Sequence, residues 1–222
     1  MSGESGSGKT ESTKLMIKFL AAASGQHSAI EQQIIESNPV LEAFGNARTL
    51  RNDNSSRFGK YIDIQFSKDG KIECARIEEY LLEKSRIISQ QNGERNFHIF
   101  YMMIRGMSAQ QRNEYALKNS PAEYACTKVG ADLKLDSWDD AEEYGKVLAA
   151  MKILNFKESE ITGTLTLLSA ILHYSSIVLQ RASINNMDGC QVCRRYFIKY
   201  IIYIYKYIYK LYYFKSFVGK KE

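Results

Sequence analysis

The sequence has few cysteines, and we expect no secretory leader. Its four cysteines are scattered at Cys74, Cys126, Cys190 and Cys193. Disulfide frameworks belong to secreted chains, which carry a leader and paired cysteines. We therefore expect a chain without disulfides in the reducing cytoplasm. Cys190 and Cys193 form a C-x-x-C pair, but no second pair or histidine cluster accompanies it, so no zinc site is expected.

Long uninterrupted apolar runs are also absent. From residue 193 onward the sequence repeats Tyr, Ile, Lys and Phe, and eight of the 15 tyrosines lie there. A membrane span needs about 20 mostly apolar residues. Every window of that length is interrupted by a charge, at Lys199, Lys206, Lys210 or Lys215. We therefore expect no membrane span.

A strong charge of one sign is missing from most of the chain. The net charge is +5, but residues 194–222 hold eight Lys or Arg and one Glu, which leaves −2 for the rest. A basic body would favour nucleic acid or an acidic surface as partner. Because the body is nearly neutral, no nucleic-acid partner is expected. The residues favoured after 193 have codons rich in A and T, which indicates translated non-coding sequence.

A glycine-rich loop opens the chain. Residues 3–10 fit the pattern G-x-x-x-x-G-K-[ST], and apolar residues at helical spacing follow. In such a loop backbone N–H groups surround phosphate oxygens, and the next helix turns its positive end towards the same anion. Lys9 would reach the β- and γ-phosphates, and the Thr10 hydroxyl would bind Mg²⁺. The alternative is a glycine-rich surface loop, since only two residues precede Gly3 where a strand is expected.

The rest of the pattern indicates an α/β chain that becomes helical. Apolar spacing predicts a helix after the loop (Leu15, Met16, Phe19, Leu20) and another over 30–44, with Pro39 as a break or restart. Residues 52–59 are polar and loop-like. Alternation over 61–66, the turn Asp69-Gly70 and a return from Ile72 to Tyr80 predict a hairpin. Three further helices are expected around 97–104, 147–154 and 165–172.

Several blocks of sequence resemble the myosin motor. They are Gly3-Glu4-Ser5-Gly6-Ser7-Gly8-Lys9-Thr10-Glu11-Ser12-Thr13-Lys14, Asn38-Pro39-Val40-Leu41-Glu42-Ala43-Phe44-Gly45-Asn46-Ala47, Asn52-Asp53-Asn54-Ser55-Ser56-Arg57-Phe58-Gly59-Lys60-Tyr61, Tyr80-Leu81-Leu82-Glu83-Lys84-Ser85-Arg86 and Glu94-Arg95-Asn96-Phe97-His98-Ile99-Phe100-Tyr101. The stretch Gln26-His27 leading into Ile30-Glu31-Gln32-Gln33 is most similar to class VII unconventional myosins. The likeness weakens after His173 and stops at Cys193.

The resemblance implies a fold and a nucleotide site. The fold would be an α/β P-loop NTPase fragment, with an incomplete sheet and a mostly helical C-terminal part. ATP and Mg²⁺ would be the cofactors, held by residues 3–10 (Gly3, Glu4, Ser5, Gly6, Ser7, Gly8, Lys9, Thr10). Residues 52–59 would be switch I. There Asn52 would bond the phosphates, Ser56 would complete the Mg²⁺ shell with Thr10, and Ser55 would lie beside the attacking water.

Arg57 has a different role in the family, where it pairs with a glutamate of switch II when the site closes. No Asp-x-x-Gly-Phe-Glu occurs in these 222 residues. We therefore expect Arg57 to lack its carboxylate here, and closure to stay incomplete. His98 invites assignment as a catalytic base. It lies in an apolar helical run with no partner in view, which favours a packed or capping histidine.

The resemblance divides the chain into a partial motor domain at residues 1–192 and an unrelated tail at 193–222. It implies the ATP-binding portion of an actin-based motor, located in the cytoplasm at the cytoskeleton. Actin filaments would be partners of the complete motor, whose main actin-binding region and switch II are not seen. We thus expect no actin-activated turnover from these residues alone.

Two alternatives remain for the function of this chain: a nucleotide-binding module without turnover and a non-functional truncated product. Kinases and transport ATPases share the phosphate loop, but they do not account for the switch I block.

Overall fold

The structure is a computed structural model that describes residues 3–4, 6–23, 29–136, 138–177, 179–184 and 187–192. The helices are α1 (Lys9–Ala23), α2 (Ala29–Gly45), α3 (His98–Gly106), α4 (Ala109–Glu114), α5 (Asp140–Ile153) and α6 (Glu158–Ser175). The strands are β1 (Asn46–Thr49), β2 (Asn52–Ser56), β3 (Gly59–Phe66), β4 (Ile72–Tyr80), β5 (Leu179–Ile184) and β6 (Met187–Val192). Short 3₁₀ turns lie at Lys84–Ile87, Pro121–Glu123 and Lys128–Gly130.

The strands that the structure describes form three separate two-stranded antiparallel ribbons. The longest joins β3 to β4, with Tyr61 opposite Glu78 and Ile64 opposite Ala75. Its turn matches the predicted one: Gly70 has a φ of 77°, which glycine tolerates without strain, and its N–H bonds the Ser67 carbonyl. The prediction that the chain combines helices with β-strands is therefore confirmed. A parallel sheet is not present among these strands.

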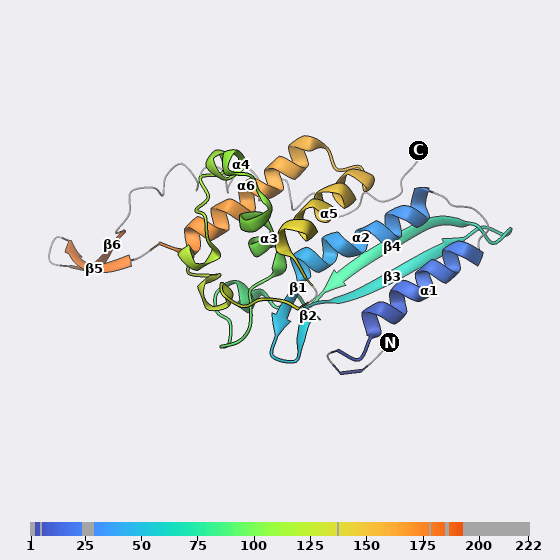
Figure 1. The fold of residues 1–222 in the computed structure, drawn as a ribbon, viewed down its shortest axis with the longest axis horizontal. Helices are drawn as coiled ribbons and strands as arrows, with labels where there is room; N and C mark the ends of the chain where they lie inside the picture. The colour runs from blue at the N-terminus through green and yellow to red at the C-terminus, as the bar shows by residue number, and fades with distance from the viewer. Residues whose placement is uncertain are drawn as a thin grey trace.

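Two apolar clusters hold the fold together. The larger surrounds α3, whose residues 98–104 are all buried, and it includes residues of α5 and α6. The smaller joins α1, α2 and the β3–β4 ribbon through Ile17, Ile34, Ile72 and Ala75. Figure 1 shows the β3–β4 ribbon between α1 and α2, with α5 and α6 beyond α2. The smaller cluster thus packs α1, the helix that follows the glycine-rich loop, against the rest of the fold.

Two expectations about local structure are wrong. Pro39 lies inside a continuous α2 rather than at a break. Residues 52–56 form strand β2, which pairs with β1 in place of a loop. The helix expected after the glycine-rich loop is confirmed as α1, where Ile17 is buried while Leu15 and Phe19 are 67% and 71% exposed.

The remaining predicted elements are confirmed, although α5 and α6 each begin seven residues before the predicted ranges of 147–154 and 165–172. The hairpin strands and the three later helices appear as β3, β4, α3, α5 and α6. No helix among the described residues is long and apolar enough to cross a membrane. Cys74 and Cys126 are free thiols. Cys193 and the tail 193–222 lie outside the described residues.

Candidate nucleotide site

The glycine-rich loop leads directly into α1. The Ser7 N–H bonds the Glu4 carbonyl at 3.2 Å, and the Ser12 N–H bonds the Gly8 carbonyl at 2.8 Å, which begins the helix. Gly6 and Gly8 both have a φ of 81°, a left-handed conformation that residues with a Cβ rarely adopt. The sequence therefore makes a tight turn at the positive end of a helix. Ser5, a predicted member of the loop, lies outside the described residues.

Lys9 folds back over this loop. Its Nζ donates to the Gly3 carbonyl at 2.6 Å and to the Glu4 carbonyl at 2.7 Å. The ammonium is exposed and is held by carbonyl oxygens rather than by a carboxylate. A cation placed over a turn of this kind can neutralise an incoming anion without first leaving an ion pair.

The second predicted segment, β2, begins beside the loop. A Cβ built on Gly6 would lie 4.0 Å from the Asn52 Nδ2, whereas at Gly8 no atom lies within 4 Å of such a Cβ. The Asn52 Oδ1 accepts from the Asn54 N–H at 2.9 Å, which orients the Asn52 amide. Residues 6 and 52 are thus brought together, with open space over the loop beside them.

The predicted switch I, residues 52–59 (here called the switch segment), is hydrogen-bonded to α2 near its C-terminal end. The Arg57 N–H bonds the Gly45 carbonyl at 2.9 Å, and the Phe58 ring lies where a Cβ on Gly45 would have to stand. Gly45 is therefore a close-approach position for which only glycine leaves room. Ser56 is exposed, and its hydroxyl donates to the Phe58 carbonyl at 3.0 Å.

Arg57 does have a carboxylate within this chain. Its Nε donates to Glu83 Oε2 at 2.7 Å, and its NH1 donates to the hydroxyl of the buried Ser55 at 3.2 Å. Glu83 follows β4 and returns to the switch segment; it is not the switch II glutamate that the resemblance implies, but it neutralises Arg57 in this conformation. Burial raises the pKa of Glu83, but hydrogen bonds from Arg86 and Arg57 outweigh this and hold the pKa below its usual value.

The predicted magnesium ligands, Thr10 and Ser56, are hydroxyls. Thr10 is half-buried in the first turn of α1, and Ser56 ends β2. Hydroxyl oxygens suit Mg²⁺, which binds oxygen ligands and retains several waters. No cluster of three or more His, Cys, Asp or Glu suited to a metal ion occurs among the described residues. The chemistry of the two hydroxyls suits a magnesium ion whose other ligands are phosphate oxygens and waters.

His98 is packed, as the sequence indicated. It is fully buried at the start of α3, its Nε2 lies 3.2 Å from Asn54 Oδ1, and its ring stacks on Trp138 with centroids 4.6 Å apart. Burial, and to a lesser extent the charge of Arg95, lowers the His98 pKa to about 3. An enclosed imidazole with so low a pKa is too weak a base, and too far from solvent, to activate a water molecule at the loop.

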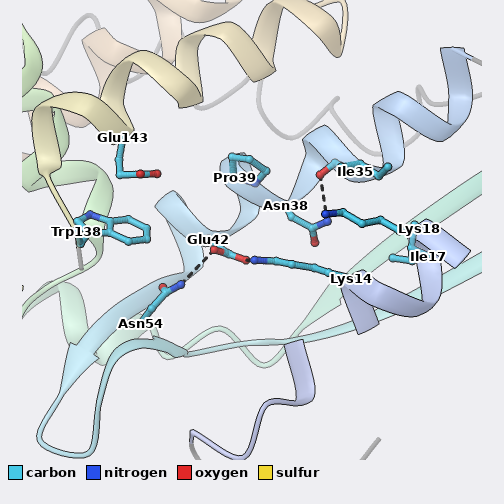
Figure 2. Close-up of a pocket in the computed structure, with 10 residues that line it drawn as sticks. All are labelled: Lys14, Ile17, Lys18, Ile35, Asn38, Pro39, Glu42, Asn54, Trp138 and Glu143. Atoms are coloured by element: carbon cyan, nitrogen blue, oxygen red, sulfur yellow. Dashed lines mark hydrogen bonds and ion pairs between the residues drawn. The ribbon is translucent and has the colours of Figure 1, made fainter. Parts of the chain in front are cut away.

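A cavity of about 360 Å³ lies behind the switch segment, between α1, α2 and the start of α5. Figure 2 shows Lys14, Glu42 and Asn54 in a row along it, with Trp138 on the side away from α1. Sequence reasoning assigned no role to Glu42, Asn54 or Lys14. All three stand in the quoted blocks, but no spacing indicated that they meet.

With this geometry in place, the comparisons with known proteins agree on one family. The myosin head (motor domain) model matches residues 1–194. The chain belongs to the myosin motor-domain family.

Its relatives confirm the likeness to class VII. The chain is 52% identical to Myosin-VIIa of Drosophila melanogaster and 53% identical to Unconventional myosin-VIIb of Mus musculus, each over 192 residues. It is 47% identical to Myosin-I heavy chain of Dictyostelium discoideum over 177 residues. These matches cover 86% of the chain for the first two and 80% for the third. The chain spans only about 9% of the length of the first two relatives and 8% of the third.

Proposed function

We propose that residues 3–10 and 52–57 form a P-loop NTPase site that binds ATP with Mg²⁺. The observation that carries the proposal is the meeting of Gly6 and Asn52 at the N-terminal end of α1. A glycine turn, a helix N-terminus and an amide then face one space. An anion in that space would be stabilised by hydrogen bonds from backbone N–H groups and by the positive end of the helix dipole.

Each side chain has a role in this proposal. Lys9 exchanges its loop carbonyls for the β- and γ-phosphates, and Thr10 and Ser56 supply hydroxyls to Mg²⁺. Asn52 donates to the phosphate chain. When bound, ATP with Mg²⁺ supplies the phosphoanhydride bond and the charge that these groups stabilise. In the present conformation the buried Ser55 hydroxyl accepts from Arg57 NH1, and its own O–H would be the donor to a water.

In the whole protein we propose that this site powers an actin-based motor. Family membership and the names of the relatives, all myosins, support this function. Actin filaments would then be the partner, and the cytoskeleton in the cytoplasm the location. Nucleotide binding without turnover is the second candidate for these residues alone, because Arg57 is held by Glu83 rather than left for a closing segment.

We further propose that residues 1–192 form the motor portion and that 193–222 are unrelated to it. The family match ends at residue 194, close to the composition break, which supports this division. Deletion of 193–222 should leave the melting midpoint of the chain unchanged. A midpoint lowered by several degrees would show that these residues stabilise the fold.

Titration of the chain with a fluorescent ATP analogue in the presence of Mg²⁺ tests the site. We expect saturable binding that Lys9→Ala weakens by about 10–100-fold, because the phosphates lose their cation. Lys18→Ala is the matched control, since Lys18 is an exposed lysine of the same helix. Equal affinities for the two variants would mean that residues 3–10 do not bind phosphate.

A further inference from the structure

Hydrogen bonds from three elements converge on the Asn54 side chain. Its Oδ1 accepts from Asn46 Nδ2 at 2.9 Å and lies 3.2 Å from His98 Nε2. Its Nδ2 donates to Glu42 Oε2 at 3.1 Å. Asn46 begins β1, His98 begins α3 and Glu42 lies in α2. Every polar atom of one β2 side chain is therefore tied to another element.

Glu42 also binds the helix that follows the phosphate loop. Its Oε1 lies 2.8 Å from the Nζ of Lys14 in α1, and the two side chains are 11% and 28% exposed. Figure 2 shows the Lys14 ammonium meeting one carboxylate oxygen of Glu42 while the other faces Asn54. One carboxylate thus joins α1 to β2, and little water reaches it to compete.

The histidine side of this network is equally fixed. The His98 Nδ1 has no hydrogen-bond partner among the described residues, and Trp138 covers the ring. A neutral imidazole has one N–H. Because Asn54 offers an oxygen to Nε2, the proton belongs on Nε2, and His98 is a donor to Asn54.

We propose that Glu42 and His98 are positioning residues that fix β2 through Asn54, and that Lys14 links β2 to the phosphate-loop helix. The inference rests on the proposed function, because β2 carries Asn52, Ser55 and Ser56. None of the side chains of Glu42, His98 and Lys14 would touch nucleotide. They set where the backbone of β2 lies relative to the loop.

The composition of β2 explains why hydrogen bonds at Asn54 are needed to hold this strand in place. Its sequence Asn-Asp-Asn-Ser-Ser has low strand propensity and no large apolar side chain to pack. Groups that bind phosphate and metal must nevertheless be held closely, since a misplacement of about 1 Å can cost about 10²-fold in rate. Buried hydrogen bonds at Asn54 supply the fixation that apolar packing gives to other strands.

Hydrogen exchange in the nucleotide-free chain tests the positioning by itself. Asn54→Ala removes three hydrogen bonds and should make the amides of β2 exchange about tenfold faster. Ser169→Ala is the matched control. The buried Ser169 hydroxyl donates to the Tyr115 carbonyl at 2.7 Å, so this variant also loses a buried hydrogen bond. It should loosen the contact between α6 and Tyr115 and leave β2 unchanged.

Nucleotide titration tests the consequence for binding. Glu42→Ala should weaken the affinity for the fluorescent ATP analogue by about tenfold. Glu42→Gln keeps an oxygen for Asn54 and should recover most of that affinity, although it loses the ion pair with Lys14. Ser169→Ala should bind as the unaltered chain does. Rescue by glutamine distinguishes positioning from a general loss of stability, which melting midpoints monitor in parallel.

The two experiments separate the two proposals. If the unaltered chain does not bind the analogue, the proposed function fails, while the exchange rates of β2 still decide the role of Asn54. If β2 exchanges at the same rate in Asn54→Ala and in Ser169→Ala, the positioning proposal is overturned. Should Asn54→Ala not fold, Glu42→Ala supplies the same comparison. An equal loss of affinity in Glu42→Ala and Glu42→Gln would overturn the role given to the hydrogen bond between Glu42 and Asn54.

Discussion

Arg57 and Arg86 share one carboxylate oxygen. The Glu83 Oε2 accepts from Arg57 Nε at 2.7 Å and from Arg86 Nε at 2.8 Å. Arg86 is nearly buried and also pairs with Glu94 at 2.9 Å. The switch segment is thereby connected, through Glu83, to a buried ion-pair network at the edge of the helical core.

Replacing Glu83 should loosen this connection. Glu83→Gln leaves Arg86 with one carboxylate instead of two and frees Arg57, so we expect the free energy of unfolding to fall by about 1–2 kcal/mol. Urea denaturation measures it. Glu78→Gln is the control, because its pair with Arg76 is exposed and contributes about 0.5 kcal/mol or less. Equal losses would show that the Glu83 pairs act as surface ion pairs.

Asp140 neutralises a fully buried arginine. Its Oδ1 lies 2.8 Å from Arg95 NH2, with the two side chains 3% and 1% exposed, and it also pairs with Arg105. Asp140→Asn leaves the Arg95 charge without a carboxylate and should lower the free energy of unfolding by about 3–5 kcal/mol. Denaturation of this variant beside Glu142→Gln, which alters the exposed pair with Lys146, checks it. A loss below about 1 kcal/mol would mean that Tyr101, whose ring lies under Arg95, holds that charge alone.

Substitution by alanine should change the stability of the chain in opposite directions at two glycines. A Cβ on Gly130 would stand 2.8 Å from the Arg95 Cα and 2.9 Å from the Glu94 carbonyl oxygen, which are backbone atoms that cannot easily move. Gly130→Ala should therefore destabilise the chain by about 1–3 kcal/mol. On Gly145, within α5, a Cβ would meet nothing within 4 Å, so Gly145→Ala should stabilise it by about 0.5–1 kcal/mol. Melting curves for both variants give the signs directly.

His98 should make stability depend on pH. The folded-state pKa is about 3, below the ordinary 6.5, so between these values the unfolded chain binds a proton that the folded chain does not. Stability is then fully present above pH 6.5 and is lost as pH falls towards 3, by at most about 1.4 kcal/mol per pH unit.

His98→Gln keeps a donor for Asn54 but does not titrate. Urea midpoints measured from about pH 7 to about pH 5 should therefore fall less steeply in this variant than in the unaltered chain. Carboxylates contribute equally to both curves, so the difference belongs to His98. Parallel curves would show that His98 is accessible to protons in the folded state.

Local sequence determined the elements whose signal lies in adjacent residues. The alternation of 61–66, the Asp69-Gly70 turn and the return to Tyr80 suffice for the β3–β4 hairpin, because period and turn chemistry are local. The spacing of apolar residues likewise predicted α3, α5 and α6. Family membership was also readable, since the matching blocks are contiguous.

Tertiary contacts decided what local signals could not. Residues 52–56 read as a loop, yet they form β2 because β1 pairs with them and Asn54 is bonded by α2 and α3. Pro39 continues α2, although proline usually interrupts a helix interior. The carboxylate that holds Arg57 lies 26 residues further on, at Glu83. Such pairs leave no periodic signal in the sequence, because their partners are set by how the elements pack. Burial then favours conformations in which most polar groups are hydrogen-bonded.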